Sequence, residues 1–288
     1  MNYILYNPKA NNENNDLNIV PGAEELEKRG VKKVSLIGLD VPAFCQSLSA
    51  EDRVLLCGGD GTLHHFANNA YGVEFPCTVC ALRSGTGNDF LTDIGQLGNE
   101  NLIDIRKYLK NLPEVEIKDD KKRCLNGVGL GVDGAVCRGI EEFKAKTNKK
   151  KANYTNISLD QLLCKYKRPS GRVTVDGVTH EYKDLWAITT MKGRYFGGGM
   201  MIAPSQDRSS GKVSIMAMHG GSKAKTLFVF LKVFKGKHVK HTEMIEMFEG
   251  YDVTVEFDEP RDLQIDGEVY TDVSVYRVRC PRPESEEK

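Results

Sequence analysis

The residues best suited to chemistry lie in a glycine-rich segment that follows an apolar run. There, Gly58-Gly59-Asp60-Gly61-Thr62 comes directly after the strand-like run Val54–Cys57. Glycines in such a turn let backbone N–H groups approach a phosphate closely, and a helix that begins there adds the positive end of its dipole. A carboxylate beside phosphates is repulsive unless a divalent cation lies between them, so Asp60 indicates Mg²⁺ bridging or proton relay. The alternative is an ordinary strand-to-helix turn capped by Thr62.

A second polar glycine segment follows the next apolar run. Its sequence is Ser84-Gly85-Thr86-Gly87-Asn88-Asp89-Phe90, after the run Thr78–Leu82. Because the carboxyl ends of parallel strands open at one edge of a sheet, the two segments are expected to converge on one crevice. Neither is a G-x-x-x-x-G-K-[ST] phosphate loop or a G-x-G-x-x-G dinucleotide fingerprint. Together they predict a nucleotide-binding site of another type.

Strands and helices alternate through the first half of the chain and would position these segments. Apolar runs predict strands at Tyr3–Tyr6, Val31–Ile37, Arg53–Cys57 and Thr78–Leu82. Periodicity predicts helices at Ala23–Arg29, Val41–Leu48, Thr62–Tyr71 and Leu102–Leu109. Nearly continuous apolar strands in this order predict a parallel sheet covered by helices on both faces.

From about Val115 short β-rich runs replace the alternation. Turn signals such as Asp176-Gly177 and Asp266-Gly267 separate them, and helical stretches are expected at Ile140–Lys146 and Lys223–Phe234. We therefore predict an α/β + β fold. A parallel-sheet α/β nucleotide-binding domain would occupy residues 1–117, and a β-sandwich domain residues 118–288, with a C-terminal tail free to return to the first domain.

The composition excludes several classes of protein. With 40 basic and 40 acidic residues the formal net charge is zero, which argues against a nucleic-acid binder that depends on overall positive charge. At 40% hydrophobic and 28% charged residues, the 288-residue chain can bury a proper core. No apolar run approaches the roughly 18 residues of a membrane span, and Met1–Pro8 lacks the features of a secretory signal. A soluble, cytoplasmic protein is expected.

The cysteines and histidines suggest no metal site. Cys77 and Cys80 form a C-x-x-C pair, but no second close pair completes a zinc site and both lie in an apolar run, so buried free thiols are expected. His64 and His65 are adjacent, and adjacent side chains on a helix point about 100° apart. One shared ion is therefore disfavoured, and surface or capping roles are expected.

Six segments in a fixed order resemble the diacylglycerol kinase catalytic-domain family, which includes bacterial lipid kinases, sphingosine kinases and ceramide kinases. Besides the two glycine segments they are Asn7-Pro8, Gly127–Asp133, Tyr195–Met200 leading to Ala203-Pro204, and Leu263–Glu268. The resemblance implies an α/β nucleotide-binding domain and a β-sandwich with the active site between them. It also implies transfer of the γ-phosphoryl group of ATP to a lipid hydroxyl, with diacylglycerol as the first expectation.

The resemblance assigns roles by motif matching. Asp60 would join the Mg²⁺ and water network, and Glu268 matches the general base that accepts the proton of the lipid hydroxyl. Without the resemblance, Glu268 would be interpreted as a solvated carboxylate at a hairpin tip. The residues near or on the ATP phosphates would be Asn7, Gly58, Gly59, Asp60, Gly61, Thr62, Leu63, His64, Gly85, Thr86, Gly87 and Asn88.

Three positions depart from the family pattern. The Ser-Gly that often follows Asn-Pro is replaced by Lys9–Asn12, and the usual Asn-Glu after the first glycine segment is His64-His65. An Asp that helps many bacterial members to bind a structural Mg²⁺ is a serine here. The resemblance leaves Asp207, Ser210 and Lys212 as the ligand positions, two of them through backbone carbonyls. Losing a carboxylate weakens such a site, because Mg²⁺ prefers charged oxygens.

A lysine-rich segment offers a route to a lipid surface. Lys223–His241 contains six lysines and no Asp or Glu, and Lys144–Lys151 contains five more lysines. One face of a helix in the first segment would carry Leu227, Phe230, Leu231 and Phe234. A basic amphipathic helix suits a peripheral contact with an anionic membrane. The alternative is an apolar face packed on the sandwich with solvated lysines.

Three functions remain open at this stage. They are a kinase for diacylglycerol or a similar lipid alcohol that uses ATP and Mg²⁺, an NAD kinase, and a nucleotide- or lipid-binding regulator whose catalysis has decayed. The altered segment after Pro8 and Ser210 favour the regulator, whereas the intact Asp60 and Glu268 oppose it. Phosphatidylglycerol, a sphingoid base and a prenol stay open as acceptors, since apolar pockets discriminate poorly. Homodimer formation through unpaired edge strands also stays open.

Overall fold

The protein consists of two compact units. The computed structural model describes residues 1–8, 30–84, 88–147 and 166–282. The N-terminal unit comprises Met1–Leu112 together with Gly197–Gly199, and the C-terminal unit comprises Pro113–Phe196 and Met200–Lys288. The division therefore falls a few residues before the boundary expected between residues 117 and 118, and one short glycine segment from the second half of the chain belongs to the first unit. The terminal residues 283–288 lie outside the described part.

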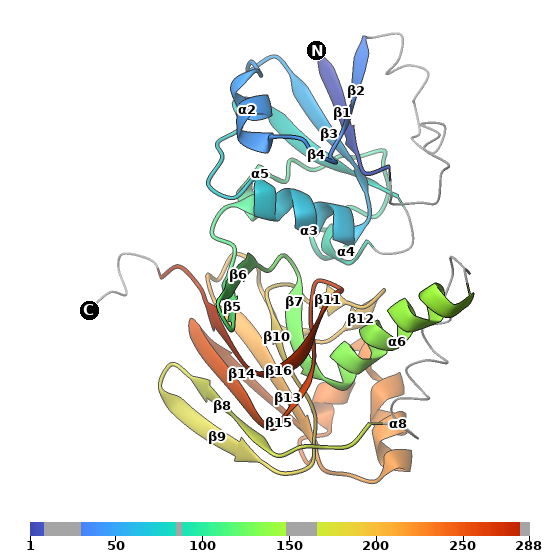
Figure 1. The fold of residues 1–288 in the computed structure, drawn as a ribbon, viewed down its shortest axis with the longest axis vertical. Helices are drawn as coiled ribbons and strands as arrows, with labels where there is room; N and C mark the ends of the chain where they lie inside the picture. The colour runs from blue at the N-terminus through green and yellow to red at the C-terminus, as the bar shows by residue number, and fades with distance from the viewer. Residues whose placement is uncertain (9–29, 85–87, 148–165, 283–288) are drawn as a thin grey trace. The chain divides into compact units, whose positions relative to one another are not determined.

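Four parallel strands form the sheet of the N-terminal unit (Figure 1). They are β1 (Asn2–Tyr6), β2 (Val31–Ser35), β3 (Arg53–Gly58) and β4 (Thr78–Arg83), in the order β2-β1-β3-β4. β3 and β4 contain continuous buried runs, Val54–Leu56 and Val79–Leu82, as strands covered on both faces require. The predicted parallel sheet is confirmed.

The described helices of this unit are short. They are α2 (Val41–Gln46), α3 (Asp60–Asn69), α4 (Asp89–Asp93) and α5 (Arg106–Leu109). The helix predicted to begin at Leu102 begins only at Arg106, because the preceding residues stay extended against β4: the backbone N–H of Ile105 donates to the carbonyl of Val79 at 2.8 Å. Asp104 then accepts a bond from the backbone N–H of Arg106 at 3.1 Å. The helix expected at Ala23–Arg29 lies outside the described residues.

The C-terminal unit is rich in antiparallel sheet, as predicted. Its main sheet has the path β14-β13-β10-β7-β15-β16-β5-β6, with β8 and β9 joined at β15. β15 pairs with β8 through its first half and with β7 through its last three residues, so the sheet folds over itself. The strands are β5 (Glu114–Ile117), β6 (Asp120–Arg123), β7 (Gly127–Gly131), β8 (Gly171–Val175), β9 (Val178–Tyr182), β10 (Leu185–Met191), β13 (Val213–His219), β14 (Ile245–Gly250), β15 (Asp252–Ile265) and β16 (Glu268–Arg279), and a small ribbon pairs β11 (Tyr195–Phe196) with β12 (Met200–Met201).

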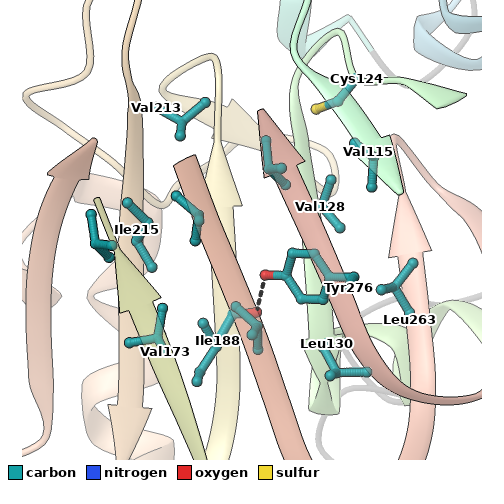
Figure 2. Close-up of a cluster of buried hydrophobic side chains, with 14 of the residues drawn as sticks. Val115, Cys124, Val128, Leu130, Val173, Ile188, Val213, Ile215, Leu263 and Tyr276 are labelled. Carbon is teal, nitrogen blue, oxygen red and sulfur yellow. Dashed lines mark hydrogen bonds between the residues drawn. The ribbon is translucent and has the colours of Figure 1, made fainter. Parts of the chain in front are cut away.

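Aliphatic residues from these strands meet in one core around Tyr276 (Figure 2). The Tyr276 hydroxyl donates to the carbonyl of Ile188 at 3.3 Å and lies 3.0 Å from the hydroxyl of Thr190. A buried tyrosine is stable only when its hydroxyl finds partners. These bonds therefore tie β16 to β10 through the middle of an otherwise apolar core.

The described part of this unit also contains two helices and two short 3₁₀ segments. They are α6 (Val132–Thr147), α8 (Lys223–Leu231), η3 (Val233–Lys235) and η4 (His238–Lys240). α6 begins eight residues before the predicted start at Ile140, because Gly131, at a φ of +126°, turns the chain directly from β7 into the helix. Gly134 and Gly139 inside α6 weaken the helical signal of the sequence. No described helix has both the length and the apolar character needed to cross a bilayer.

Candidate active site

The carboxyl ends of three neighbouring strands bring most of the predicted nucleotide-binding residues to one edge of the parallel sheet. β1 is followed by Asn7, β3 ends at Gly58, and β4 is followed by Ser84. Because β3 lies between β1 and β4, these three points are adjacent. Asn88 precedes α4, whereas Gly85, Thr86 and Gly87 lie outside the described residues.

The first glycine segment places residues without side chains at the start of α3. Gly58 has to be glycine, because a Cβ there would lie 2.3 Å from the side chain of Thr62. Gly59 is the N-cap residue, without a side-chain cap bond, and α3 begins at Asp60, two residues before the predicted start. A Cβ on Gly61 would meet no described atom within 4 Å. The first-turn N–H groups and the positive dipole end of α3 therefore suit a phosphate.

Asp60 joins the two glycine segments. Its Oδ2 accepts a hydrogen bond from the backbone N–H of Asp89 at 2.8 Å, and its Oδ1 accepts one from Phe90 at 3.0 Å. These are first-turn N–H groups of α4, which have no partner within the helix. The carboxylate thus fixes the start of α4 against the start of α3. The sequence predicted a carboxylate at the phosphates but not this positioning role.

Asp89 is a second carboxylate at this edge, and the sequence analysis gave it no role. It is 5% exposed and accepts bonds at 2.7 Å from the backbone N–H groups of Gly198 and Gly199. Burial and then the negative charge of Asp60 raise its pKa to about 6, against the opposing effect of the two glycine N–H groups. The available signal was an acid at the start of a helix directly after a glycine segment.

The donor set at this edge fits Mg²⁺. Two carboxylates, Asp60 and Asp89, lie close enough for the charge of one to raise the pKa of the other. A divalent cation relieves such repulsion, and Mg²⁺ is commonly held by one or two carboxylates together with substrate phosphates. The described residues contain no cluster of three or more His, Cys, Asp and Glu side chains that would hold a metal without such a substrate.

The environment of His64 differs from the one expected for the paired histidines. A surface or capping role is wrong for this residue, because its side chain is 3% exposed on the buried face of α3, whereas His65 is exposed. The Nδ2 of Asn68 donates to the His64 carbonyl at 3.0 Å and lies 3.5 Å from its Nε2. The ring of His64 is therefore part of the packing beneath the first glycine segment.

Glu268 is the first residue of β16, in the C-terminal unit. It follows a two-residue turn in which Asp266 and Gly267 have φ values of +50° and +96°, as tight hairpins require. Its backbone pairs with Ile265 across the hairpin, so its position is fixed and its side chain is half-buried. The Asp266 carboxylate anchors the turn by accepting backbone N–H bonds from Leu125 (2.6 Å), Asn126 (2.7 Å) and Gly127 (2.9 Å).

A polar cluster lies on one face of the C-terminal sheet. Gly129 of β7 pairs with Thr189 on one side and with Gln264 on the other, so the side chains of these two residues share that face. The Asp133 carboxylate covers Gly129, where a Cβ would lie 1.4 Å from its Oδ2, and Oδ2 accepts a bond from the Thr189 hydroxyl at 3.3 Å. Burial raises the pKa of Asp133 to about 6.

Gln264 gives this polar cluster an unused donor. The residue is fully buried, and its Oε1 accepts a bond from the Gly267 backbone N–H at 2.9 Å. Its Nε2 has no hydrogen-bond partner among the described residues. A buried amide left in this state is costly, which makes it a candidate contact for a bound polar group. The sequence signal was weak: Asp133 follows a strand that ends in glycine, as Asp60 does.

The three positions expected to hold a structural Mg²⁺ surround an amide instead. The side chain of Gln206 is 6% exposed, and its Nε2 lies 3.1 Å from the carbonyl oxygens of both Asp207 and Lys212. Its Oε1 accepts a bond from the Ser214 hydroxyl at 2.5 Å. The Ser210 hydroxyl donates to the Asp207 carbonyl at 2.8 Å.

The Asp207 carboxylate is also occupied. It accepts bonds from the backbone N–H of Ser209 at 2.8 Å and from the Ser209 hydroxyl at 2.7 Å. With an amide nitrogen at the carbonyl oxygens of Asp207 and Lys212, the loop does not fit a cation held through those oxygens.

Two other features of the N-terminal unit lie away from the glycine segments. Cys77 and Cys80 are buried free thiols, as expected, and burial raises the pKa of each. A surface hollow of about 800 Å³ is lined by residues such as Tyr71, Phe75 and Arg106. Tyr71 and Phe75 lie between α3 and β4, and Arg106 begins α5, which follows β4, so the hollow shares no residue with the two glycine segments.

Known proteins share both units. Residues 2–117 match the diacylglycerol kinase catalytic domain, and residues 126–283 match the YegS C-terminal NAD kinase beta sandwich-like domain. A diacylglycerol kinase of Mycobacterium tuberculosis H37Rv is 26% identical over 234 residues, covering 76% of this chain and 73% of that protein. YtlR of Bacillus subtilis strain 168, a candidate lipid kinase, is 22% identical and covers 98% of this chain and 97% of its own.

A solved structure has the same fold. The crystal structure of a candidate diacylglycerol kinase from Bacillus anthracis strain Sterne aligns with a TM-score of 0.68 at 18% identity. The alignment covers 98% of this chain and 94% of that one.

A parallel sheet that ends in two glycine segments, followed by an antiparallel unit that folds over itself, defines a two-unit kinase. With both units matched, the chain belongs to the diacylglycerol kinase family. It is a lipid kinase, a phosphotransferase that uses ATP and has an alcohol group as its acceptor.

Proposed function

We propose that the chain phosphorylates diacylglycerol to phosphatidic acid with ATP and Mg²⁺. The observation that carries the proposal is the junction of the two glycine segments, where Asp60 binds the first N–H groups of α4. The relative of Mycobacterium tuberculosis, named a diacylglycerol kinase, supports diacylglycerol as the acceptor.

The nucleotide-binding edge supplies positioning and charge. The start of α3, with Gly58, Gly59 and Gly61, would receive the phosphates of ATP, and Asn7 would lie beside them. Mg²⁺, held by Asp60 and Asp89, would neutralise the phosphate charge. Phosphoryl transfer depends mainly on such positioning and neutralisation, since the protein performs little covalent chemistry itself.

Glu268 is proposed as the general base. As the lipid hydroxyl oxygen forms its bond to the γ-phosphorus, the bond between that phosphorus and the β–γ bridging oxygen of ATP breaks and ADP leaves. The hydroxyl proton moves to the Glu268 carboxylate. The rigid hairpin, anchored through Asp266, keeps this side chain in a defined place.

The cluster of Asp133, Thr189 and Gln264 is proposed to hold the polar head of the lipid. Diacylglycerol offers one hydroxyl and two ester carbonyls, so it needs both an acceptor and donors. Asp133 and Thr189 provide the acceptor and a hydroxyl, and the Gln264 Nε2 is a buried donor with no partner among the described residues. We also propose a peripheral contact with the membrane in which such a lipid resides.

Transfer of labelled γ-phosphate from ATP to lipid alcohols in mixed micelles tests the function. The panel contains diacylglycerol, phosphatidylglycerol, a sphingoid base and a prenol, each with and without Mg²⁺, and NAD as a soluble acceptor. Mg²⁺-dependent label in phosphatidic acid supports the proposal. Label mainly in another lipid or in NAD contradicts the acceptor, and ATP binding without any product would indicate a regulator.

A further inference from the structure

Helix α8 and η3 present large apolar side chains to solvent. Phe228 is 56% exposed, Leu231 57% and Phe234 46%. Among the described residues, eight large apolar side chains are at least 44% exposed, and these three fall within seven consecutive residues. The other five are scattered along the chain and include no aromatic residue. A cluster of exposed apolar side chains on a folded protein marks an interaction surface.

These side chains are not needed to hold the helix. α8 packs through Thr226 and Val229, both fully buried, and η3 packs through Val233. The Ser222 side chain caps the helix by accepting a bond from the Lys225 N–H. The face predicted from the sequence is therefore divided, with Leu227 and Phe230 partly buried and Leu231 and Phe234 exposed.

The same segment carries one sign of charge. Lys223–His241 contains six lysines and no acidic residue. Lys225 pairs with Glu243 at 2.9 Å, and the Lys232 ammonium lies 4.0 Å from the centre of the Phe228 ring. Lys235, Lys237 and Lys240 are exposed and form no ion pair within the part of the chain that the structure describes. Part of the second lysine-rich segment, from residue 148 onward, lies outside that part.

We propose that these six residues, Phe228, Leu231, Phe234, Lys235, Lys237 and Lys240, form a docking surface for an anionic lipid bilayer. We call this set the α8 surface. The apolar side chains enter the boundary between headgroups and acyl chains, and the lysines contact the headgroups. The inference deepens the proposed function, on which it rests, because a kinase for a membrane lipid has to reach its acceptor at the bilayer.

Charge selects the bilayer over a second copy of the chain. In a symmetric dimer the same patch faces itself, so the lysines of both copies would lie opposite one another. An anionic bilayer instead offers phosphate groups for the lysines and acyl chains for the aromatic rings. An acidic protein would offer the first but not a deformable apolar layer for three side chains that protrude from one short segment.

Vesicle binding of the full chain tests the proposal without any substrate. Co-sedimentation is compared for phosphatidylcholine vesicles and for vesicles that also contain phosphatidylglycerol. The wild-type chain is expected to prefer the anionic vesicles and to dissociate as salt is raised. The triple change Phe228→Ser, Leu231→Ser, Phe234→Ser should weaken binding at least about tenfold. The triple change Lys235→Gln, Lys237→Gln, Lys240→Gln should weaken it about fivefold per lysine at low salt.

Matched controls separate this surface from general hydrophobicity. Leu97→Ser and Val178→Ser replace two other exposed apolar side chains and should leave vesicle binding unchanged, and circular dichroism verifies the fold of every variant. Wild-type binding by the serine triple variant overturns the proposal. So does a dimer that this variant converts to monomer while vesicle binding persists, or binding to an acidic protein alone.

A second assay distinguishes failure of docking from failure of the proposed function. With short-chain diacylglycerol dispersed in detergent, the serine triple variant should keep the wild-type kcat, since its substitutions lie outside the proposed catalytic residues. Vesicle binding without turnover on any lipid would leave the docking surface intact and contradict the proposed function. Turnover in micelles without vesicle binding by the wild-type chain would contradict the docking surface and leave the proposed function intact.

Discussion

Two carboxylates at the proposed nucleotide-binding edge differ in their hydrogen bonds and burial. Asp60 accepts two backbone N–H bonds at the start of a neighbouring helix, whereas Asp89 is buried beside it and accepts two from glycines far along the chain. The charge of Asp60 helps to raise the pKa of Asp89 to about 6. This residue is therefore neutral in mild acid and charged near neutrality, where a divalent cation would be bound.

The raised pKa of Asp89 predicts a pH-dependent stability. An unfolded aspartate loses its proton near pH 4, whereas the folded protein keeps this proton up to about pH 6. Between these values the native state binds more protons, so the free energy of unfolding falls as pH rises, by about 3 kcal/mol in total above pH 6. Asp89→Asn lacks this titration. Between pH 4 and pH 7 its free energy of unfolding should therefore rise by about 3 kcal/mol relative to that of the wild type.

Urea unfolding at a series of pH values measures this difference. The single tryptophan, Trp186, lies in the C-terminal unit, so the N-terminal unit is followed by far-ultraviolet circular dichroism. A constant difference between wild type and variant across this range would show that Asp89 does not titrate as assigned.

The general-base role predicts a specific kinetic loss. Glu268→Gln keeps the size and shape of the side chain but cannot accept the proton, so kcat should fall by about 10²- to 10⁴-fold while ATP binding is retained. Glu181→Gln, on the exposed edge of β9, is the matched control and should leave kcat unchanged. Equal kcat for Glu268→Gln and wild type in the γ-phosphate transfer assay would eliminate this role.

Some helices and strands can be predicted from the sequence, whereas others depend on contacts that the local sequence does not encode. β3 and β4 were predicted almost to the residue, because continuous apolar runs bounded by glycine segments leave few alternatives. α6 was missed over its first eight residues, because its start depends on Gly131 adopting a positive φ beneath β10. The link between Asp60 and α4 joins positions 29 and 30 residues apart, and no local pattern encodes such a contact.

The loop after β12 also shows how a departure from a family pattern can be compensated. The sequence has Ser210 where many bacterial members have a metal-binding Asp, and this suggested a weakened cation site. In the fold, the Gln206 side chain lies within 3.3 Å of three backbone carbonyls, those of Lys192, Asp207 and Lys212. An internal amide thereby supplies the donors that organise the loop.

The hydrogen bonds of Gln206 predict that the stability of the loop after β12 does not depend on Mg²⁺. Gln206→Met removes the amide, so the buried Ser214 hydroxyl and the three backbone carbonyls lose a hydrogen-bond partner. The free energy of unfolding should fall by about 3 kcal/mol. Unfolding followed through the buried Trp186 reports on this unit, and Gln46→Met, at an exposed glutamine, is the control. Chelation of Mg²⁺ should not shift the unfolding midpoint of the nucleotide-free wild type. A midpoint that falls with chelator and recovers with Mg²⁺ would restore the cation site.

At the scale of the whole molecule, the two units divide the chemistry. The residues proposed to bind the nucleotide belong to the N-terminal unit, and Glu268, the polar cluster and the α8 surface belong to the C-terminal unit. The sequence predicted this division from its change of texture, but it could not assign Gly197–Gly199 to the N-terminal unit. Gly198 and Gly199 of this segment donate backbone hydrogen bonds to Asp89, a contact between distant parts of the chain that no local pattern encodes.

The contact of Gly198 and Gly199 with Asp89 predicts that ATP protects amides far apart in the sequence. Saturating ATP with Mg²⁺ should slow amide hydrogen exchange at the start of α3, at the start of α4 and at Gly198 and Gly199, because all three sites are linked through Asp60 and Asp89. At a ligand concentration about 100 times Kd, the slowing can reach about a hundredfold for amides that exchange through global unfolding. Peptides from the exposed β9 hairpin are the internal control and should not change. Protection of the glycine peptide by diacylglycerol micelles but not by ATP would place that segment with the lipid, and the carboxylate pair would then lose its assigned role at the nucleotide.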